Sequence, residues 1–254
     1  MTQKQNKLYI DLSQTAEPLV SGAGLAEADG YILTSGELPA GLDIDGKEIL
    51  LQNVLPQSYP DIAGLVHTRI CSSGLEDSAR LRDQHPEFDW VPRVDAIHQQ
   101  TAYHFPESQD SANFRTYQPV FLNQSPYLID DGAISLTLWL KKAAELGFSS
   151  VWLHAPGAAN AAMGLDLALR EMAVKIWSGN LWLSGGASTI MHIKYLVHEG
   201  GVDTLVIPPA LAFELGCNEI YASLHKEMAP QQTGMPESAE KSPADLPQDE
   251  FQGE

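Results

Sequence analysis

The sequence predicts an α/β protein, built as a single (β/α)8 barrel of the TIM type with an irregular first half. Two observations lead to this prediction. Strand-like apolar runs alternate with helical patterns along the second half of the chain, which is typical of parallel βαβ units. The strand-like runs number about eight, and 254 residues is an ordinary length for such a barrel. An open, doubly wound sheet is the alternative.

Four strand-like runs fill the first half, each apolar and bounded by turn residues. They are KLYIDLS (7–13), GYILTSG (30–36), EILLQNV (48–54) and GLVHTRI (64–70). A helical pattern follows at 74–85, whereas the Gly- and Pro-rich connection at 37–47 does not favour a helix. The fifth strand is either DWVPRVD (89–95) or YQPVFLN (117–123), and an irregular excursion is expected at about 98–130.

The second half alternates more clearly. Helical spacing of apolar residues predicts helices at 134–148, 164–177 and 189–201, with Gly147 and the pair at 200–201 placed to end two of them. Between and after them, strands are predicted at SSVWLHA (149–155), NLWLSG (180–185) and VDTLVIPP (202–209). The barrel is therefore expected to span 1–227. Residues 228–254, rich in Pro, Glu, Gln and Ser, are expected to form a disordered acidic tail.

Composition and charge restrict the function classes. A formal net charge of −18 repels nucleic-acid phosphates, so no nucleic-acid partner is expected. The N-terminus lacks the apolar core of a signal peptide and no window is apolar enough to span a membrane, so a cytoplasmic protein without a membrane partner is expected. Only Cys71 and Cys217 are present, and neither a zinc spacing nor a complete dinucleotide fingerprint occurs. No metal and no cofactor are expected, and a homo-oligomer stays open.

Candidate catalytic residues lie where the predicted strands end, because functional side chains in such barrels gather at the carboxyl ends of strands. Asp11 is the best single candidate, since a carboxylate at a strand end can transfer a proton; the alternative is that it caps the next turn. His154 is either an acid–base group or simply hydrogen-bonded. The full set of catalytic candidates is Asp11, Thr34, Asn53, Arg69, Asp95 and His154.

The stretch LWLSGGASTIMH (181–192) predicts an anion site. A strand-like run ends in a glycine pair and two hydroxyl residues just before a helical pattern. A helix N-terminus offers N–H groups and the positive end of its dipole to a phosphate. The candidate phosphate ligands are Gly185, Gly186, Ser188 and Thr189, with simple N-capping by Ser188 or Thr189 as the alternative.

Residues 7–41 and GGASTIMHIKYLVHEGGVDTLVIPPALAFEL (185–215) resemble the opening and closing segments of the transaldolase and fructose-6-phosphate aldolase family. The resemblance implies a proton-handling role for Asp11, strand-end roles for Thr34 and Asn53, and phosphate binding by Ser188. The chain departs from the family where its Schiff-base lysine belongs, because Arg69 stands there and cannot form an imine.

A second resemblance joins residues 181–207 to the phosphate-binding strands of histidine-biosynthesis isomerase and cyclase barrels. That resemblance implies that Asp11 and Asp95 act as acid and base.

The sequence therefore leaves three alternative functions open. The first is a divergent transaldolase-like barrel of carbohydrate metabolism, which binds a phosphorylated sugar or similar small anion without Schiff-base chemistry. In it, Arg69 would supply a cation if it faces the barrel mouth. The second is an acid–base isomerase of a phosphorylated metabolite that uses Asp11 and Asp95. The third is a non-catalytic pseudoenzyme that acts as a binding module.

Overall fold

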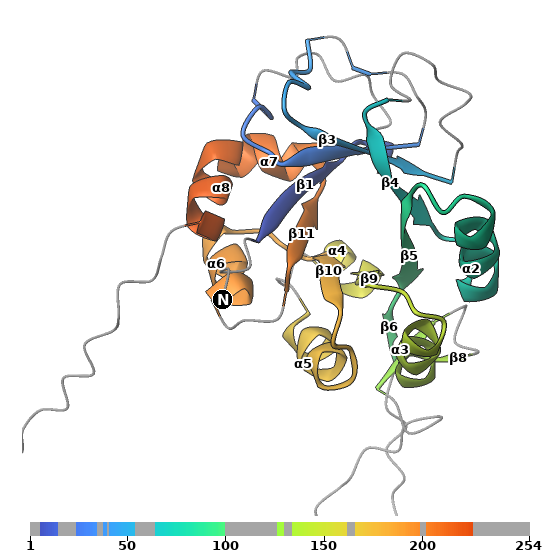
Figure 1. Cartoon of the computed structure of the whole chain (residues 1–254). Coiled ribbons are helices and arrows are strands. Elements are labelled where there is room, and N and C mark those ends of the chain that lie inside the picture. Colours follow the sequence, from blue (N-terminus) through green and yellow to red (C-terminus); the bar gives the residue numbers. More distant parts are fainter. Residues whose placement is uncertain are drawn as a thin grey trace, which may run out of the picture.

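Eight parallel strands close into a barrel (Figure 1). The structure, a computed structural model, describes residues 6–14, 24–34, 38–39, 41–53, 64–99, 126–129, 134–161, 166–198 and 202–225. Around the barrel the strands follow the order β1-β11-β10-β9-β5-β4-β3-β2, and β1 pairs with both β11 and β2. The barrel strands are β1 (Lys7–Asp11), β2 (Gly30–Leu33), β3 (Glu48–Gln52), β4 (Val66–Cys71), β5 (Asp89–Asp95), β9 (Ser150–His154), β10 (Asn180–Ser184) and β11 (Thr204–Ile207).

Helices lie around the outside of this barrel (Figure 1). They are α2 (Leu75–Gln84), α3 (Leu136–Glu145), α4 (Pro156–Ala161), α5 (Leu167–Ile176), α6 (Ile190–His198), α7 (Pro209–Leu215) and α8 (Cys217–His225), with the 3-10 turn η1 (Leu12–Gln14) after β1. A separate antiparallel sheet is formed by β6 (Ile97–His98), β7 (Tyr127–Ile129) and β8 (Ile134–Ser135).

The predicted α/β class and the eight strands are confirmed, and the sheet closes rather than staying open. The run at 89–95 is the barrel strand, whereas the competing run at 117–123 lies outside the described residues. The irregular first half is also found: within the described residues, no α-helix separates β1, β2, β3 and β4. The expected excursion begins and ends in the antiparallel sheet, and its middle, like the predicted tail at 228–254, is outside the described residues.

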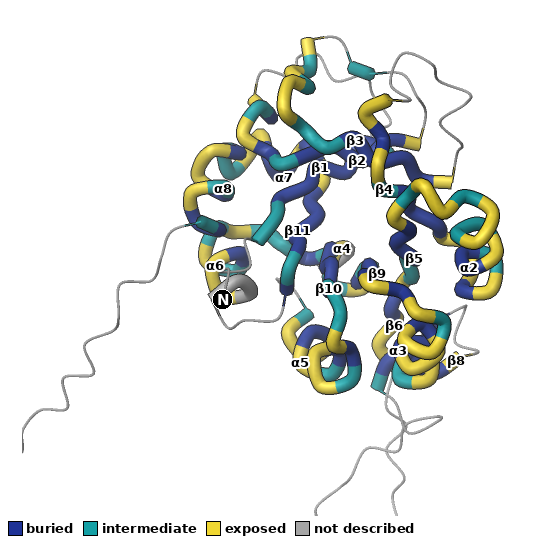
Figure 2. Tube along the Cα trace, in the orientation of Figure 1, coloured by how far each residue is buried: buried dark blue, intermediate teal, exposed yellow. Residues whose placement is uncertain are grey.

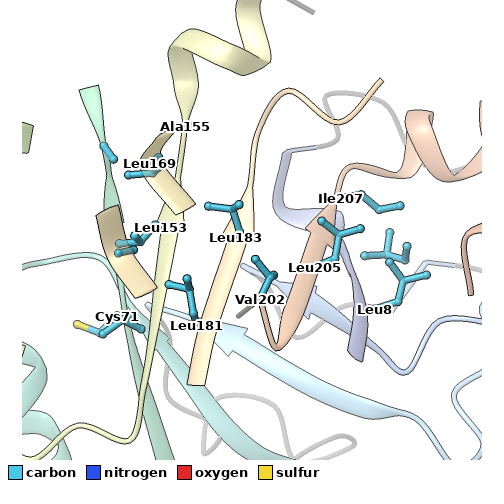
Figure 3. Packing of buried hydrophobic residues seen from close by; sticks show 14 of the residues in the cluster. Leu8, Cys71, Leu153, Ala155, Leu169, Leu181, Leu183, Val202, Leu205 and Ile207 are labelled. Carbon is cyan, nitrogen blue, oxygen red and sulfur yellow. The ribbon is translucent and has the colours of Figure 1, made fainter. Parts of the chain in front are cut away.

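Strand side chains alternate between two hydrophobic cores, because successive residues of a strand point to opposite faces. The barrel interior is filled by one residue from each strand: Tyr9, Ile32, Leu50, Ile70, Val91, Trp152, Trp182 and Val206. The neighbouring residues along the strands form a second core outside the barrel, to which Leu153, Leu183 and Leu205 belong (Figure 3). Both strand faces are thus buried, while the helices leave their outer faces exposed (Figure 2).

The amino ends of the strands are fixed by carboxylates at the start of neighbouring strands. Asp29 accepts a hydrogen bond from the N–H of Leu8 at 2.7 Å, and Asp203 accepts one from the N–H of Leu181 at 2.7 Å. Glu48 accepts from Lys7 and, at 2.6 Å, from the hydroxyl of Tyr9. These acidic residues therefore satisfy buried donors at the end of the barrel opposite to the strands' carboxyl ends.

Candidate functional site

A ring of polar side chains lies above the inner hydrophobic layer, at the carboxyl ends of the strands. Each inner-layer residue is followed, two positions later, by a residue on the same face of the strand. Within the strands, counting two residues from Tyr9, Leu50, Val91, Trp152 and Trp182 gives a set of polar residues that face the barrel mouth: Asp11, Gln52, Arg93, His154 and Ser184. This ring is called the mouth ring below. The same count from Ile32, Ile70 and Val206 leads past the last residue of the strand, to Thr34, Ser72 and Pro208.

Three members of the mouth ring share one cavity. Asp11, His154 and Ser184 line a pocket of about 150 Å³ together with the glycine turn after β10. The Asp11 carboxylate accepts hydrogen bonds from the N–H of Ser13, at 3.0 Å, and from the hydroxyl of Ser13. Asp11 therefore caps the turn that follows β1, as the alternative predicted, and it also lines the cavity. Proton transfer by Asp11 stays a prediction.

His154 is held by a hydroxyl and surrounded by charges. Its Nδ1 lies 2.8 Å from Oγ of Ser184, which also accepts a hydrogen bond from Nε1 of Trp152 at 2.8 Å. Burial lowers the pKa of His154 and the positive charge of Arg93 lowers it further, whereas Asp95 and Asp11 act in the opposite direction. The imidazole is therefore neutral at neutral pH, and a neutral imidazole can accept a proton.

The lowered pKa makes the free energy of unfolding depend on pH. Below the ordinary histidine pKa of about 6.5 the unfolded chain binds a proton at His154 that the folded protein resists, so stability falls as the pH falls. His154→Asn is expected to remove this dependence, whose upper limit for a single proton is about 1.4 kcal/mol per pH unit. Urea unfolding between pH 5 and pH 7.5 measures it, with His67→Asn on the exposed surface of β4 as the control. Equal pH slopes for the wild type and His154→Asn would contradict the prediction.

Arg93 is the cation of the mouth ring. Its Cζ lies 4.9 Å from the centre of the Trp152 ring, inside the barrel, and its Nη2 lies 3.2 Å from Oδ1 of Asp95. Asp95, half-exposed at the end of β5, is thus paired with Arg93 and stands in register with His154. Around the barrel, the strands from β5 to β1 follow the order β5, β9, β10, β11 and β1, which makes four pairings. His154, on β9, therefore lies between Asp95 on β5 and Asp11 on β1.

The glycine turn after β10 has a backbone that only glycine adopts readily. Gly185 has φ 100° and Gly186 has φ 78°, both in the left-handed region. A Cβ added at Gly185 would lie 2.4 Å from the carbonyl oxygen of Ala155. The chain therefore passes close to the end of β9, and residues 185–188 form one wall of the cavity.

The two hydroxyl residues of this turn have different positions. Oγ1 of Thr189 accepts a hydrogen bond from the N–H of His192 at 3.2 Å, as expected of an N-cap of α6. Ser188 lines the cavity, and its Oγ lies 3.1 Å from Nδ1 of His192. Of the four predicted phosphate ligands, Gly185, Gly186 and Ser188 line the cavity, while Thr189 is exposed and caps the helix.

The other predicted site residues lie apart from this cavity. Thr34 follows β2 and is exposed. Asn53 has φ 60°, and its side-chain amide bonds Ser72 twice: Nδ2 donates to Oγ at 2.7 Å, and Oδ1 accepts from the backbone N–H at 3.0 Å. Arg69 is buried on the outer face of β4, where its pairing partners Leu51 and Trp90 belong to the outer core. Arg69 therefore does not supply a cation to the mouth.

Sequence reasoning missed Arg93 and Gln52. Both lie in runs that were correctly predicted to be strands, and both lie two residues after an inner-layer side chain. The sequence did not show which face of each strand lies inside the barrel, because both faces are apolar, so no pattern singled out these two residues. Gln52 is buried, and its Oε1 has no hydrogen-bond partner among the described residues, so the mouth ring holds an acceptor that a ligand can use.

Within the described residues, no group of three or more His, Cys, Asp or Glu side chains is arranged to hold a metal ion. None of the described helices combines the length and the apolar character that crossing a membrane requires.

A closed parallel barrel with a polar ring and a glycine turn at its mouth is the class of protein that the fold and site define. No protein-family model matches the chain, and no curated protein sequence matches it. Among solved structures, the chain is similar to one in the crystal structure of the Amycolatopsis orientalis BexX/CysO complex. The TM-score is 0.53 at 12% identity, and the match covers 88% of each chain. At that identity the similarity concerns the fold alone.

The family assignment made from the sequence is corrected by these comparisons. The similar structure is named as neither a transaldolase nor a histidine-biosynthesis enzyme, and no family model of either kind matches. Both resemblances are therefore wrong. Their basis was a Gly-Gly-Ala-Ser turn between an apolar strand and a helix. In this structure the close approach of the Ala155 carbonyl oxygen to Gly185 explains the glycine there, so the turn does not by itself identify a family.

Proposed function

We propose that the protein binds a small phosphorylated metabolite, such as a phosphorylated sugar, in the mouth of an irregular (β/α)8 barrel of the TIM type. One observation carries this proposal. The glycine turn, Ser188, His154 and Asp11 come from different strands and line a single cavity at the carboxyl ends of those strands. Its volume of about 150 Å³ is smaller than that of an ordinary ligand pocket, so the cavity takes the phosphate group and the atoms next to it rather than a whole sugar phosphate.

The chain has a net charge of −18, which repels a phosphorylated ligand, so local positive groups are needed for such a ligand to bind. The glycine turn leads into α6, whose N-terminus carries a partial positive charge. Arg93 lies inside the barrel, paired with Asp95, and its guanidinium can add charge-assisted hydrogen bonds to a phosphate. These two local features act against the unfavourable field of the whole molecule.

Acid–base isomerisation is the reaction that we propose for this site. A neutral imidazole and a carboxylate in one cavity can move a proton between adjacent carbons of a substrate whose phosphate lies on the glycine turn. Asp11 and His154 have these positions. The pair Asp11 and Asp95 is less suitable, because Asp95 bonds Arg93 at 3.2 Å and lies on another strand, four pairings away.

Thermal unfolding in the presence of candidate ligands tests the proposal. Sugar phosphates and triose phosphates are added at low salt, and a ligand at a hundred times its dissociation constant is expected to add about 2.7 kcal/mol to the free energy of unfolding. Ser188→Asp, which places a negative charge in the cavity, is expected to abolish the effect. Thr189→Asp is the matched control, because Thr189 is exposed and outside the cavity lining. Absence of any ligand effect, or an effect that Ser188→Asp leaves unchanged, would contradict the proposal.

Turnover separates catalysis from binding alone. If the ligand that stabilises the protein is isomerised, Asp11→Asn and His154→Asn are expected to lower the rate about 100-fold or more, since positioned acid–base groups contribute that much. If the wild-type protein binds the ligand but does not isomerise it, the proposed isomerase activity is wrong and the protein is a non-catalytic binding module.

A further inference from the structure

A buried arginine with no polar partner among the described residues lies on the outer face of β4. Arg69 pairs in register with Leu51 and Trp90, and both of these side chains belong to the outer core. Its guanidinium carbon is 5.5 Å from the centre of the Trp90 ring and 5.6 Å from that of Phe88. The aromatic rings lie against the guanidinium, but they accept no in-plane hydrogen bond from its N–H groups.

Two of the three guanidinium nitrogens of Arg69 are buried and make no hydrogen bond to the described residues. The residue is only 2% exposed, and its Nε and Nη1 have no hydrogen-bond partner in the described part of the chain. No described carboxylate forms an ion pair with it either. Burial lowers the pKa of Arg69 to about 10, so the side chain is still a cation at neutral pH. Buried charges in folded proteins are normally paired, which makes this arginine an exception that needs a counter-ion.

A cavity lies beside this guanidinium. Its volume is about 310 Å³, and it is lined by Asn53, Arg69, Cys71, Ser72, Ser73 and Trp90, among others. The Asn53 amide holds Ser72 at the end of β4 through two hydrogen bonds, so this part of the wall is fixed. The cavity therefore combines a buried cation with hydroxyl and amide groups on a rigid strand end.

The start of α2 adds to the positive character of the cavity. Ser73 precedes the N-cap residue Gly74, and no side chain caps the helix there. The first N–H groups of a ten-residue helix therefore lie next to the wall that Ser72 and Ser73 form. Of the acidic residues in the first turn, Asp77 is bonded to Arg80 at 2.7 Å and Glu76 is exposed.

We infer that this cavity is a second anion site, in which Arg69 binds the oxyanion of inorganic phosphate or of a phosphate monoester. The site goes beyond the function proposed for the mouth, because it lies at the ends of β3 and β4 and shares no lining residue with the mouth cavity. A phosphate there accepts hydrogen bonds from the guanidinium edge and from Ser72 or Ser73. The bound anion supplies the counter-ion that the described residues do not provide.

Isothermal titration with inorganic phosphate, in chloride buffer at low salt, tests this site. Arg69→Met keeps the length and apolar body of the side chain while removing its charge, and is expected to weaken binding at this site at least 10-fold. Trp90 fluorescence is a second readout, since its ring lies over the guanidinium. Arg80→Met, which removes an exposed cation from the same helix region, is the control and is expected to bind phosphate like the wild type. A titration with glycerol phosphate in place of phosphate shows whether a monoester is preferred.

A second variant keeps the test valid if Arg69→Met does not fold. Ser72 is exposed at the cavity wall, and Ser72→Asp puts a carboxylate where the anion is expected, so it should also weaken phosphate binding at least 10-fold. Wild-type protein that binds no phosphate, or binding that both variants leave unchanged, overturns the second site.

The mouth site is distinguished from the second site by Arg93→Met. Phosphate binding that survives Arg93→Met but is lost in Arg69→Met supports the second site alone. The opposite pattern supports the mouth site and overturns the inference drawn here.

Discussion

Gly185→Ala is expected to lower the free energy of unfolding by about 3 kcal/mol or more, through two separate costs. A non-glycine residue in the left-handed region, here at φ 100°, costs roughly 1–2 kcal/mol. The added Cβ would also lie 2.4 Å from the carbonyl oxygen of Ala155, a backbone atom that cannot rotate away. Because Ala155 donates its N–H to the carbonyl of Ser184, movement of either strand end breaks a contact between β9 and β10.

Thermal unfolding measures this effect, and a decrease of the melting temperature of about 10 °C is expected for a chain of this size. Two other glycines separate the two costs. Gly46 has φ 68° with nothing within 4 Å, so Gly46→Ala measures backbone strain alone. Gly30 has no left-handed φ, but its added Cβ would lie 2.3 Å from the carbonyl oxygen of Glu48, so Gly30→Ala measures steric overlap alone. A Gly185→Ala protein no less stable than Gly46→Ala would show that the turn can relax.

Arg93→Met is expected to weaken phosphate-ligand binding in the mouth by about 10- to 100-fold, since hydrogen bonds to charged groups contribute roughly 1.5–3 kcal/mol. The same substitution removes the positive charge that lowers the pKa of His154, while Asp95 and Asp11, which raise it, remain. The pKa of His154 should therefore rise toward its ordinary value. This second effect does not depend on knowing the ligand.

Proton NMR of the His154 ring through a pH titration, together with ligand titration, measures both effects. Arg80→Met serves as the control, because it removes an exposed arginine and is expected to change neither quantity. An unchanged His154 titration in Arg93→Met would mean that the arginine does not act on the imidazole. Unchanged ligand affinity would mean that the cation plays no part in the mouth site.

Local patterns were sufficient to predict the barrel strands and four of the helices, but not α4, α7 and α8. Apolar runs bounded by turn residues predicted all eight barrel strands, with 89–95 as one of two alternatives for the fifth. Helical spacing predicted α2, α3, α5 and α6. The placement of Asp11, His154 and the glycine turn at strand ends was also correct, because strand ends are defined by local chain signals. The antiparallel sheet of β6, β7 and β8 was not predicted, since two of its strands have only two residues each.

What the sequence by itself determined, then, is which segments form strands and which polar residues end them. Only the tertiary structure decided which side chains meet. Closure brings Lys7 into register with Thr204, a contact between residues almost 200 positions apart that no local pattern contains. Closure also decides which face of each strand lies inside, so that Arg93 enters the mouth while Arg69 lies outside. The physical reason is that strands of a closed parallel barrel are buried on both faces. Their apolar runs are therefore nearly continuous, and the alternation that would identify the inner face is absent from the sequence.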